Sequence, residues 1–456
     1  MVLLDAGDSR PVHFVGIAGA GMSALAELVL RRGVPVTGCD ANPESAVDLR
    51  RLGVQVERHD PAHVRGARAL VVTSAMPKDH PELARARELG VPVIRRAEAL
   101  GEVTAGRELV AIAGTHGKTS TTVMTTVALA AAGRDPTALA GGRVSAWGGN
   151  LRLGGDRLYV VEADEYDRSF LALSPTVAVV NNIEADHLDI YTDLADIKAA
   201  FARFARGART VVLCADDAGA NSLPTPSSAE VIRFGIVSPD ARVRAADLAL
   251  GAVGATFRLV YDDEDLAAVE LRVPGRHNVL NALAALSAGL ALGASAPAMA
   301  KGLAGFGGVE RRFQPLGEVR GVVVVDDYAH NPGKVAAALA TARVAYPGRR
   351  LVVAFQPHLF TRTRDFASEF GTALAAADTV FLTDIYPARE QPISGVTTSL
   401  IADALLAARG HLAWVGERGA LADALADAVR EGDVVLTVGA GDITKTGPEL
   451  LERLRR

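Results

Sequence analysis

The stretch AIAGTHGKTSTT combines glycines, a lysine and a threonine at a spacing that suits a bound nucleoside triphosphate. Gly114 and Gly117 let backbone N–H groups approach phosphate oxygens, and the N-terminus of the helix that follows favours negative charge. Lys118 then meets the β- and γ-phosphates, and the Thr119 hydroxyl is placed to ligate Mg²⁺. Ile112 stands where the usual G-x-x-x-x-G-K-[ST] motif has its first glycine, so only the second half matches. The alternative is an ordinary strand-to-helix turn.

Two apolar runs farther along the chain end in residues that can hold a metal ion. LYVVE ends in the acid Glu162, the position of a Walker B carboxylate, and TVAVVNNIEADH delivers His187 in the same manner. Because Mg²⁺ prefers oxygen ligands, a histidine is an unusual second ligand. A structural histidine and a solvated acidic turn are the alternatives for this second run.

A second glycine-rich loop, GIAGAGMSA, lies near the N-terminus. Gly19, Gly21 and Ala24 fit the pattern G-x-G-x-x-[GA] after a strand, and Asp40 ends the next strand. This spacing is typical of a dinucleotide site, in which the diphosphate lies on a helix N-terminus and the acid binds a ribose hydroxyl. A UDP-sugar carries the same two groups, so the pattern indicates a nucleoside diphosphate and leaves nicotinamide as one option.

The elements that position these loops alternate between strand and helix in three successive units. The first contains the strands PVHFVGIAG, PVTGCD, ALVVTSAMP and PVIRR, and the others repeat the alternation with different sequences. Such alternation predicts α/β units with parallel sheets. The stretch from about 240 to 275 alternates like antiparallel strands. We place the domains at residues 1–103, 104–313 and 314–456.

Composition excludes several classes of protein. The chain has 456 residues and a formal net charge of -5, so no basic surface for nucleic acid is expected. Its two cysteines, Cys39 and Cys214, cannot form a disulfide framework, and the N-terminus lacks the features of a signal peptide. The weakly polar run at 282–300 favours a packed helix over a membrane span. These features predict a cytoplasmic protein that contacts no membrane.

Several segments, in order along nearly the whole chain, resemble the Mur ligases. They are HFVGIAGAGMSALAE, AIAGTHGKTSTT, VEADEYDRSFLALSP, NNIEADHLDIY, GRHNVLNALAA, ERRFQPLG, DDYAHNP, FQPHLFTRTRDF, DIYPAREQPISGV and GAGDITKTGPELL. The resemblance implies three α/β domains: a Rossmann-like N-terminal UDP-sugar-binding domain, a central P-loop ATPase-type domain and a Rossmann-like C-terminal domain. The first loop is then expected to hold UDP and the second ATP, with the last domain closing over the amino acid.

The resemblance also implies a reaction, an ATP-dependent ligation in peptidoglycan precursor synthesis. ATP is expected to phosphorylate the lactyl carboxylate of UDP-N-acetylmuramate, and the amine of L-alanine to attack the acyl phosphate. The implied cofactors are ATP and Mg²⁺, the implied partners are these small-molecule substrates, and the chain is expected to be a monomer or homodimer. A close alternative is the recycling ligase, which attaches the L-Ala-D-Glu-diaminopimelate tripeptide to the same UDP-sugar.

The resemblance, matched residue by residue, assigns five overlapping sets. The expected catalytic residues are Lys118, His330 and Arg362, and the last two share the amino-acid site with Tyr328. The expected metal ligands are Thr119, Glu162 and His187. The expected ATP-binding residues are Gly114, Thr115, His116, Gly117, Lys118, Thr119, Ser120, Asn278, Asn281 and Asp326. The expected UDP-sugar-binding residues are Gly19, Ala20, Gly21, Met22, Ser23, Asp40 and Ser74.

The sequence departs from the family pattern at a few positions. Leu359 stands where the family usually has arginine, Asn331 replaces a second histidine, and Tyr166 and Arg168 replace smaller residues. Many relatives have a lysine that bridges two metal ions, and this chain has no equivalent, because Lys198 lies about one helical turn before the usual position. The branch of the family that adds L-alanine generally lacks this lysine too. Two other classes compete: an NAD-dependent oxidoreductase, which leaves the central loop unexplained, and a non-catalytic sugar-nucleotide sensor, which the intact lysine, threonine and glutamate oppose.

Overall fold

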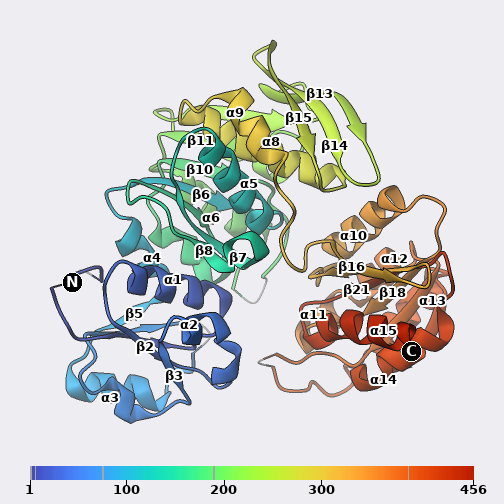
Figure 1. Ribbon diagram of the computed structural model, residues 1–456, viewed down its shortest axis with the longest axis horizontal. Helices are drawn as coiled ribbons and strands as arrows, with labels where there is room; N and C mark the ends of the chain where they lie inside the picture. The colour runs from blue at the N-terminus through green and yellow to red at the C-terminus, as the bar shows by residue number, and fades with distance from the viewer. Residues whose placement is uncertain (1–2, 6, 74–75, 188–189, 389) are drawn as a thin grey trace. The chain divides into compact units, whose positions relative to one another are not determined.

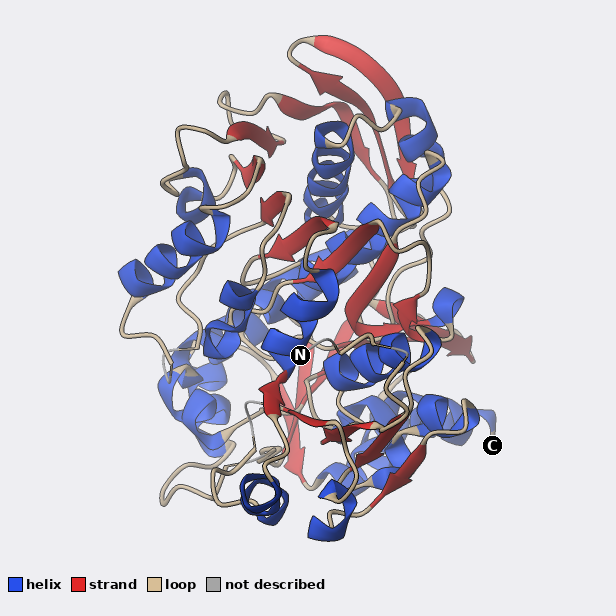
Figure 2. Ribbon diagram, turned by 90° about the vertical axis from the view of Figure 1, so that its left-hand side faces the viewer, coloured by secondary structure: helices blue, strands red, loops and turns tan. Residues whose placement is uncertain are grey.

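The residues that the structure describes form three β-sheets, each built from one stretch of the chain (Figure 1). The computed structural model describes residues 3–5, 7–73, 76–187, 190–388 and 390–456. Helices and strands alternate over much of the chain, and Figure 2 distinguishes the two by colour. The chain divides into two compact units, a first unit of Met1–Leu248, Thr256–Leu271 and Asn278–Phe306 and a second of Ala249–Ala255, Arg272–His277 and Gly307–Arg456.

The first sheet has five strands in the order β3-β2-β1-β4-β5, and its neighbouring strands are parallel. The strands are β1 (Val12–Val15), β2 (Val36–Cys39), β3 (Gln55–Glu57), β4 (Ala69–Val72) and β5 (Val93–Arg95). The helices between or after them are α1 (Ala20–Arg31), η1 (Pro43–Ser45), α2 (Val47–Arg51), η2 (Pro61–Val64), α3 (Pro81–Leu89) and α4 (Arg96–Thr104). Every residue of β1 and β4 is buried, as expected for central strands of a parallel sheet.

The second sheet has ten strands in the order β15-β14-β13-β12-β11-β10-β6-β9-β7-β8. They are β6 (Glu108–Ala113), β7 (Thr137–Val144), β8 (Gly149–Arg152), β9 (Leu158–Glu162), β10 (Val177–Val180), β11 (Thr210–Cys214), β12 (Glu230–Gly235), β13 (Val243–Leu250), β14 (Ala255–Tyr261) and β15 (Glu264–Leu271). The accompanying helices are α5 (Lys118–Ala131), η3 (Ser145–Trp147), η4 (Tyr166–Ala172), α6 (Leu194–Ala205), α7 (Ala218–Asn221), α8 (Arg276–Ala291) and α9 (Ala296–Leu303). Strand β6 lies between β10 and β9, so the loop after β6 lies near the carboxyl ends of both neighbours.

The third sheet has six strands in the order β16-β17-β21-β18-β19-β20, with β16 antiparallel to β17. The strands are β16 (Gln314–Val319), β17 (Val322–Asp327), β18 (Leu351–Phe355), β19 (Thr379–Thr383), β20 (Leu412–Gly416) and β21 (Val434–Val438). The helices are α10 (Pro332–Ala345), α11 (Phe360–Asp365), α12 (Ala367–Leu374), α13 (Ser399–Ala407), α14 (Arg418–Ala428), η5 (Asp442–Lys445) and α15 (Thr446–Arg455). Pro332 begins α10 directly after its N-cap, Asn331, whose side chain accepts a hydrogen bond from the backbone of Lys334.

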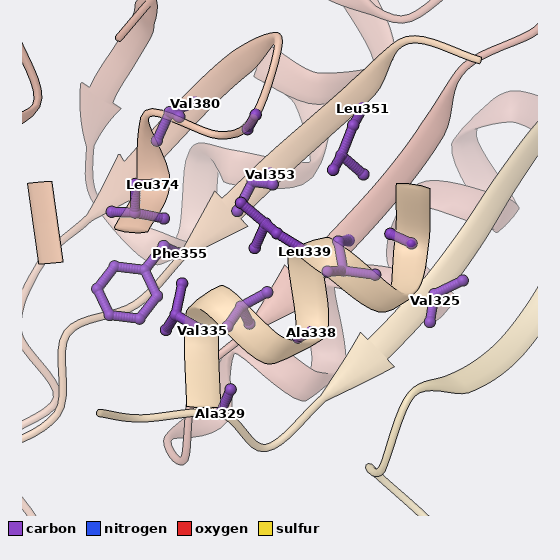
Figure 3. Close-up of a cluster of buried hydrophobic side chains, with 14 of the residues drawn as sticks. Val325, Ala329, Val335, Ala338, Leu339, Leu351, Val353, Phe355, Leu374 and Val380 are labelled. Carbon is purple, nitrogen blue, oxygen red and sulfur yellow. The ribbon is translucent and has the colours of Figure 1, made fainter. Parts of the chain in front are cut away.

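One core of the second unit lies between α10 and this sheet (Figure 3). Val335 and Leu339 of α10 pack with Val325 of β17 and with Val353 and Phe355 of β18, and all five side chains are fully buried. Burial of each such side chain contributes about 1.5–3 kcal/mol to stability. The core therefore fixes the strand end from which Tyr328 and His330 follow.

The α/β class with parallel sheets is confirmed. The run at 282–300 divides between the packed helices α8 and α9, as predicted, and the region from about 240 to 275 forms β13, β14 and β15. The hairpin of β7 and β8 was not predicted, because its strands are rich in glycine and lack a clear alternation. No helix in the described ranges combines the length and the apolar character needed to cross a membrane.

Candidate active site

The central glycine-rich loop joins β6 to α5 and adopts the backbone that its glycines predict. Gly114 has a φ of 139° and Gly117 a φ of 79°, both in the region that favours glycine. A Cβ on Gly117 would lie 2.3 Å from Oδ1 of Asn281 and 3.1 Å from Nδ2 of Asn181. The loop therefore needs glycine here for its conformation and for its close packing against the two asparagines.

The end of β10 holds this loop from the side. The backbone N–H groups of Thr115 and His116 donate to the main-chain and side-chain oxygens of Asn182, at 3.1 and 2.6 Å. Nδ2 of Asn181 donates to Oγ1 of Thr121 at 2.9 Å. The His116 ring lies 2.9 Å from Oε2 of Glu184. Residues that directly follow β10 thus fix the loop.

The two asparagines expected at the adenine are buried at the start of α8. Oδ1 of Asn281 accepts a hydrogen bond from Oγ1 of Thr121 at 3.2 Å, and its Nδ2 donates to Oδ1 of Asn278 at 3.3 Å. Both asparagines are less than a tenth exposed. Asn281 supports the loop through Thr121 and Gly117, and the adenine role of both residues stays a prediction.

Lys118 forms a buried ion pair with Glu165. Its Nζ donates to Oε1 and Oε2 of Glu165 at 2.8 and 2.7 Å and to the Gly114 carbonyl at 2.7 Å. Burial disfavours the ammonium ion, but the carboxylates of Glu165, Asp164 and Glu162 outweigh it and raise the pKa of Lys118. The lysine therefore stays charged, and the Glu165 carboxylate pairs with the ammonium group that a phosphate is expected to bind.

The three predicted metal ligands lie on elements around this lysine. Thr119 is buried in the first turn of α5, beside Ser120. Glu162 ends β9 opposite Ile112 of β6, and its Oε2 accepts a hydrogen bond from the Gly141 backbone at 2.7 Å. The Thr119 hydroxyl and the Glu162 carboxylate are oxygen donors of the kind that Mg²⁺ prefers, whereas the nitrogen of His187 is an unusual ligand for this ion.

Glu165 links the lysine to the predicted histidine. Nε2 of His187 lies 3.7 Å from Oε1 of Glu165, and the His187 ring meets Tyr166 edge to face. The Tyr191 hydroxyl donates to the Glu165 carbonyl at 2.6 Å. Lys198 donates to Oγ of Ser222 at 3.1 Å. The structure thus brings Lys118 and His187 to one carboxylate that the motif analysis did not single out.

The N-terminal loop also follows the predicted pattern. Gly19 precedes α1, and Ala20, Gly21, Met22 and Ser23 form its first turn. A Cβ on Gly21 would lie 3.0 Å from Nη1 of Arg96, a basic residue at the start of α4 that the sequence reading did not single out. Ser74 lies outside the described residues.

Asp40 supports the backbone of this loop. Its Oδ2 accepts a hydrogen bond from the Ala18 backbone at 3.0 Å, and its Oδ1 accepts one from Asn42 at 2.9 Å. The predicted contact with a ribose remains a prediction. To bind a ribose hydroxyl, the Asp40 carboxylate must either accept a further hydrogen bond or give up one of its two bonds to the backbone.

The second unit positions the predicted amino-acid site at the end of β17. Nδ1 of His330 donates to the Tyr328 carbonyl at 2.8 Å, and the two rings meet edge to face. The His358 ring lies 6.0 Å from that of His330. Burial and the positive charges of Lys334 and Arg362 lower the pKa of His330 well below its usual value, so its imidazole is neutral at pH 7.

Asp326, predicted to contact the nucleotide, is fully buried in β17. Its two oxygens accept hydrogen bonds from the hydroxyls of Thr437 and Thr444 at 2.6 and 2.9 Å, and Nε of Arg311 lies 3.4 Å from one of them.

Leu359 has a φ of 72° and directly precedes α11, the helix that carries Arg362. This backbone region is unfavourable for any residue with a side chain, so position 359 carries local strain whether leucine or arginine occupies it.

A glycine-rich loop between a central parallel strand and a helix, with its lysine ringed by carboxylates, defines a P-loop nucleotide-binding protein. Family models match three consecutive stretches: the Mur ligase family catalytic domain at residues 11–108, the Mur ligase middle domain at 112–289 and the Mur ligase glutamate ligase domain at 311–441. The chain belongs to the Mur ligase family.

Relatives match over almost the full length. The chain is 46% identical to a UDP-N-acetylmuramate–L-alanine ligase of Acidothermus cellulolyticus, over 97% of this chain and 95% of the relative. It is 47% identical to the enzyme of that name from Kineococcus radiotolerans, over 97% and 96%. Among solved structures, UDP-N-acetylmuramate-alanine ligase from Thermotoga maritima is 30% identical with a TM-score of 0.84, covering 98% of this chain and 99% of the other. A murein peptide ligase from Psychrobacter arcticus is 25% identical with a TM-score of 0.74, covering 98% of each.

Proposed function

We propose that the protein is an ATP-dependent ligase that joins L-alanine to the lactyl carboxylate of UDP-N-acetylmuramate in peptidoglycan precursor synthesis. The observation that carries this proposal is the likeness, at 46–47% identity over 97% of the chain, to relatives that bear the name of this reaction. The nucleotide-binding loop around Lys118 supports it independently, because it supplies the ATP site that such a ligation requires.

In this proposal Mg-ATP supplies the phosphoryl group that converts the unreactive carboxylate into an acyl phosphate. Lys118 binds the β- and γ-phosphates and offsets the repulsion between the two anions that must meet. Thr119, Glu162 and His187 hold the metal ion. Glu165 keeps Lys118 charged and aimed at the loop until a phosphate replaces the carboxylate.

Residues of the second unit serve the incoming amino acid. The Arg362 guanidinium pairs with its carboxylate, which suits the planar fork of arginine. Since His330 is neutral, its free Nε2 can accept a hydrogen bond from the amine and orient it for attack on the acyl phosphate. Tyr328 packs against the His330 ring and fixes its orientation.

The second candidate is attachment of the L-Ala-D-Glu-diaminopimelate tripeptide to the same UDP-sugar. The likeness to the murein peptide ligase favours it, although the TM-score and identity are lower than for the L-alanine ligase. Both reactions use the same ATP and UDP-sugar sites. The two reactions differ in the amine that attacks the acyl phosphate, so only a comparison of L-alanine with the tripeptide distinguishes them.

The test offers the purified protein Mg-ATP and UDP-N-acetylmuramate with L-alanine, L-serine, glycine or the tripeptide, one at a time. ADP release and the mass of the nucleotide product are measured together, with Lys118→Met as the inactive control. We expect strong stimulation by L-alanine and a product heavier by one alanyl residue. Stimulation by the tripeptide alone moves the protein to the second candidate, and silence with every acceptor overturns both.

Three further points belong to the proposal. The metal is Mg²⁺, the reaction takes place in the cytoplasm, and the enzyme acts as a monomer or homodimer. Turnover with Mg²⁺ against a chelator, cell fractionation, and light scattering on the eluting protein test these points in turn. Full activity in chelator, recovery in the membrane fraction, or a larger assembly would contradict the respective point.

A further inference from the structure

Four side chains that can ligate a metal ion meet beside the first sheet, behind the N-terminal glycine-rich loop. They are His13 of β1, Cys39 of β2, His63 of η2 and Glu82 of α3, and one ligand atom from each lies within 4.8 Å of the others. Glu82 and Cys39 are completely buried, and His13 is 2% exposed. Because a buried carboxylate needs a compensating charge, this arrangement calls for an explanation.

Hydrogen bonding explains only part of the cluster. Sγ of Cys39 lies 3.2 and 3.1 Å from Oε1 and Oε2 of Glu82, and the Asp60 backbone donates to Oε1 at 2.9 Å. However, Nε2 of His13 and Nδ1 of His63 are buried with no hydrogen-bond partner among the described residues. Two unpaired ring nitrogens in one buried site are costly unless a ligand uses them.

The other nitrogen of each ring is held in the manner of a metal-bound histidine. Nδ1 of His13 lies 2.9 Å from Oγ1 of Thr37, and Nε2 of His63 lies 2.9 Å from Oε2 of Glu57. Ligating histidines almost always use their second nitrogen in this way, often with a carboxylate, which fixes the ring and leaves the opposite lone pair for the metal.

The ligand atoms lie within 4.8 Å of one another, and the pair from His63 and Glu82 already has the separation that a small tetrahedral ion requires. Zn²⁺ bonds of about 2.0–2.3 Å place ligand atoms about 3.3–3.8 Å apart. Nδ1 of His63 lies 3.7 Å from Oε1 of Glu82, and the Cys39–Glu82 contacts require a small expansion. A thiolate, a carboxylate and two neutral imidazoles also balance the charge of a divalent cation, which removes the cost of the buried charges.

We propose that His13, Cys39, His63 and Glu82 form a structural Zn²⁺ site in the N-terminal domain. Binding converts the Cys39 thiol to a thiolate and releases its proton to solvent. His59 borders the site, since its side chain is 32% exposed and its Nδ1 lies 3.2 Å from Sγ of Cys39.

The site lies directly behind the N-terminal glycine-rich loop. The carbonyl of Cys39 accepts hydrogen bonds from the backbones of Gly16 and Ile17 at 2.8 and 3.1 Å, and the next residue, Asp40, holds Ala18. A metal ion that fixes the end of β2 therefore also fixes the loop. This inference concerns folding and does not depend on the proposed reaction.

The test uses the full chain, stripped with a chelator and titrated with Co²⁺, which replaces Zn²⁺ and reports its ligands by absorption. We expect one equivalent to bind with a thiolate-to-cobalt charge-transfer band and intense tetrahedral d–d bands, both bleached by Zn²⁺. Cys39→Ser should lose the charge-transfer band. Cys214→Ser, which changes the other cysteine of the chain, should retain it.

A second variant keeps the test decisive if Cys39→Ser does not fold. Glu57 is exposed, so Glu57→Gln should fold normally, and loss of this support for His63 should weaken Co²⁺ binding about 10- to 100-fold. Zn²⁺ should raise the unfolding midpoint of the wild type but not of Cys39→Ser. A wild type without the charge-transfer band, a band that persists in Cys39→Ser, or unchanged affinity in Glu57→Gln would overturn the proposal.

Discussion

Replacement of Glu165 by glutamine tests whether this carboxylate holds Lys118 until a phosphate arrives. The two oxygens lie 2.8 and 2.7 Å from Nζ, and the side chains are 13% and 4% exposed for lysine and glutamate. At an effective dielectric constant of about 20, the gross attraction at this distance is about 6 kcal/mol. Loss of one partner of a buried pair usually costs about 3–5 kcal/mol.

We expect Glu165→Gln to reduce the stability of the first unit by about 2–3 kcal/mol. The loss should fall below the usual range because Asp164 and Glu162 still offset the charge of Lys118, and glutamine can still accept one hydrogen bond. Excess ATP in the presence of a chelator should reduce the difference from wild type to below about 1 kcal/mol, since the phosphates replace the missing charge.

Urea unfolding followed by Trp147 fluorescence, in a Trp414→Phe background, reports on the first unit alone. The matched control is Glu184→Gln, which removes the partner of His116 in the same loop. Glu184 is half exposed, so this change should cost less than about 1 kcal/mol. Equal losses in the two variants, or a Glu165→Gln deficit that ATP leaves unchanged, would refute the reasoning.

Two further predictions concern the loop and the amino-acid site. Gly117→Ala should lower the free energy of unfolding by about 1–3 kcal/mol more than Gly133→Ala, as measured by urea unfolding. Both glycines have a positive φ, but only a Cβ at position 117 would meet a side chain, that of Asn281. Equal losses in the two variants would contradict the packing argument. Lys334→Gln should raise the pKa of His330 in an NMR titration, because a charge that opposes the imidazolium is removed; an unchanged pKa would contradict this. Because the pKa of His330 is lower in the folded state than in the unfolded state, the second unit should lose stability as the pH falls below about 6.5. Lys334→Gln should lose less stability, because the folded-state pKa of its His330 lies closer to the unfolded value.

The features that the sequence predicted are those coded locally. The loop around Lys118 and the carboxylate of Glu162 follow apolar strands, and strand polarity alone brings such ends to one edge of a parallel sheet. Glu165 was not singled out because its contact with Lys118 depends on the turn after β9. That turn carries positive φ at Asp167 and Arg168, which sequence patterns do not reveal.

The supporting contacts of the loop were missed for a related reason. Asn181 and Asn182 were visible in the sequence as a polar pair after a buried strand, but their role depends on the pairing of β10 with β6. The four-residue cluster that contains Cys39 and Glu82 could not be predicted from the sequence, because its members come from separate elements and match no metal-binding motif. Only tertiary packing brings such residues together.

The central claim, activation of the lactyl carboxylate by ATP, is tested most directly by following its oxygen. UDP-N-acetylmuramate labelled with ¹⁸O in that carboxylate is incubated with the protein, Mg-ATP and L-alanine, and the released phosphate is analysed by mass spectrometry. We expect one labelled oxygen in the phosphate for each amide bond formed, because the acyl phosphate leaves as phosphate when the amine attacks. Amide product accompanied by unlabelled phosphate, or no phosphate release that depends on L-alanine, would contradict the proposed reaction.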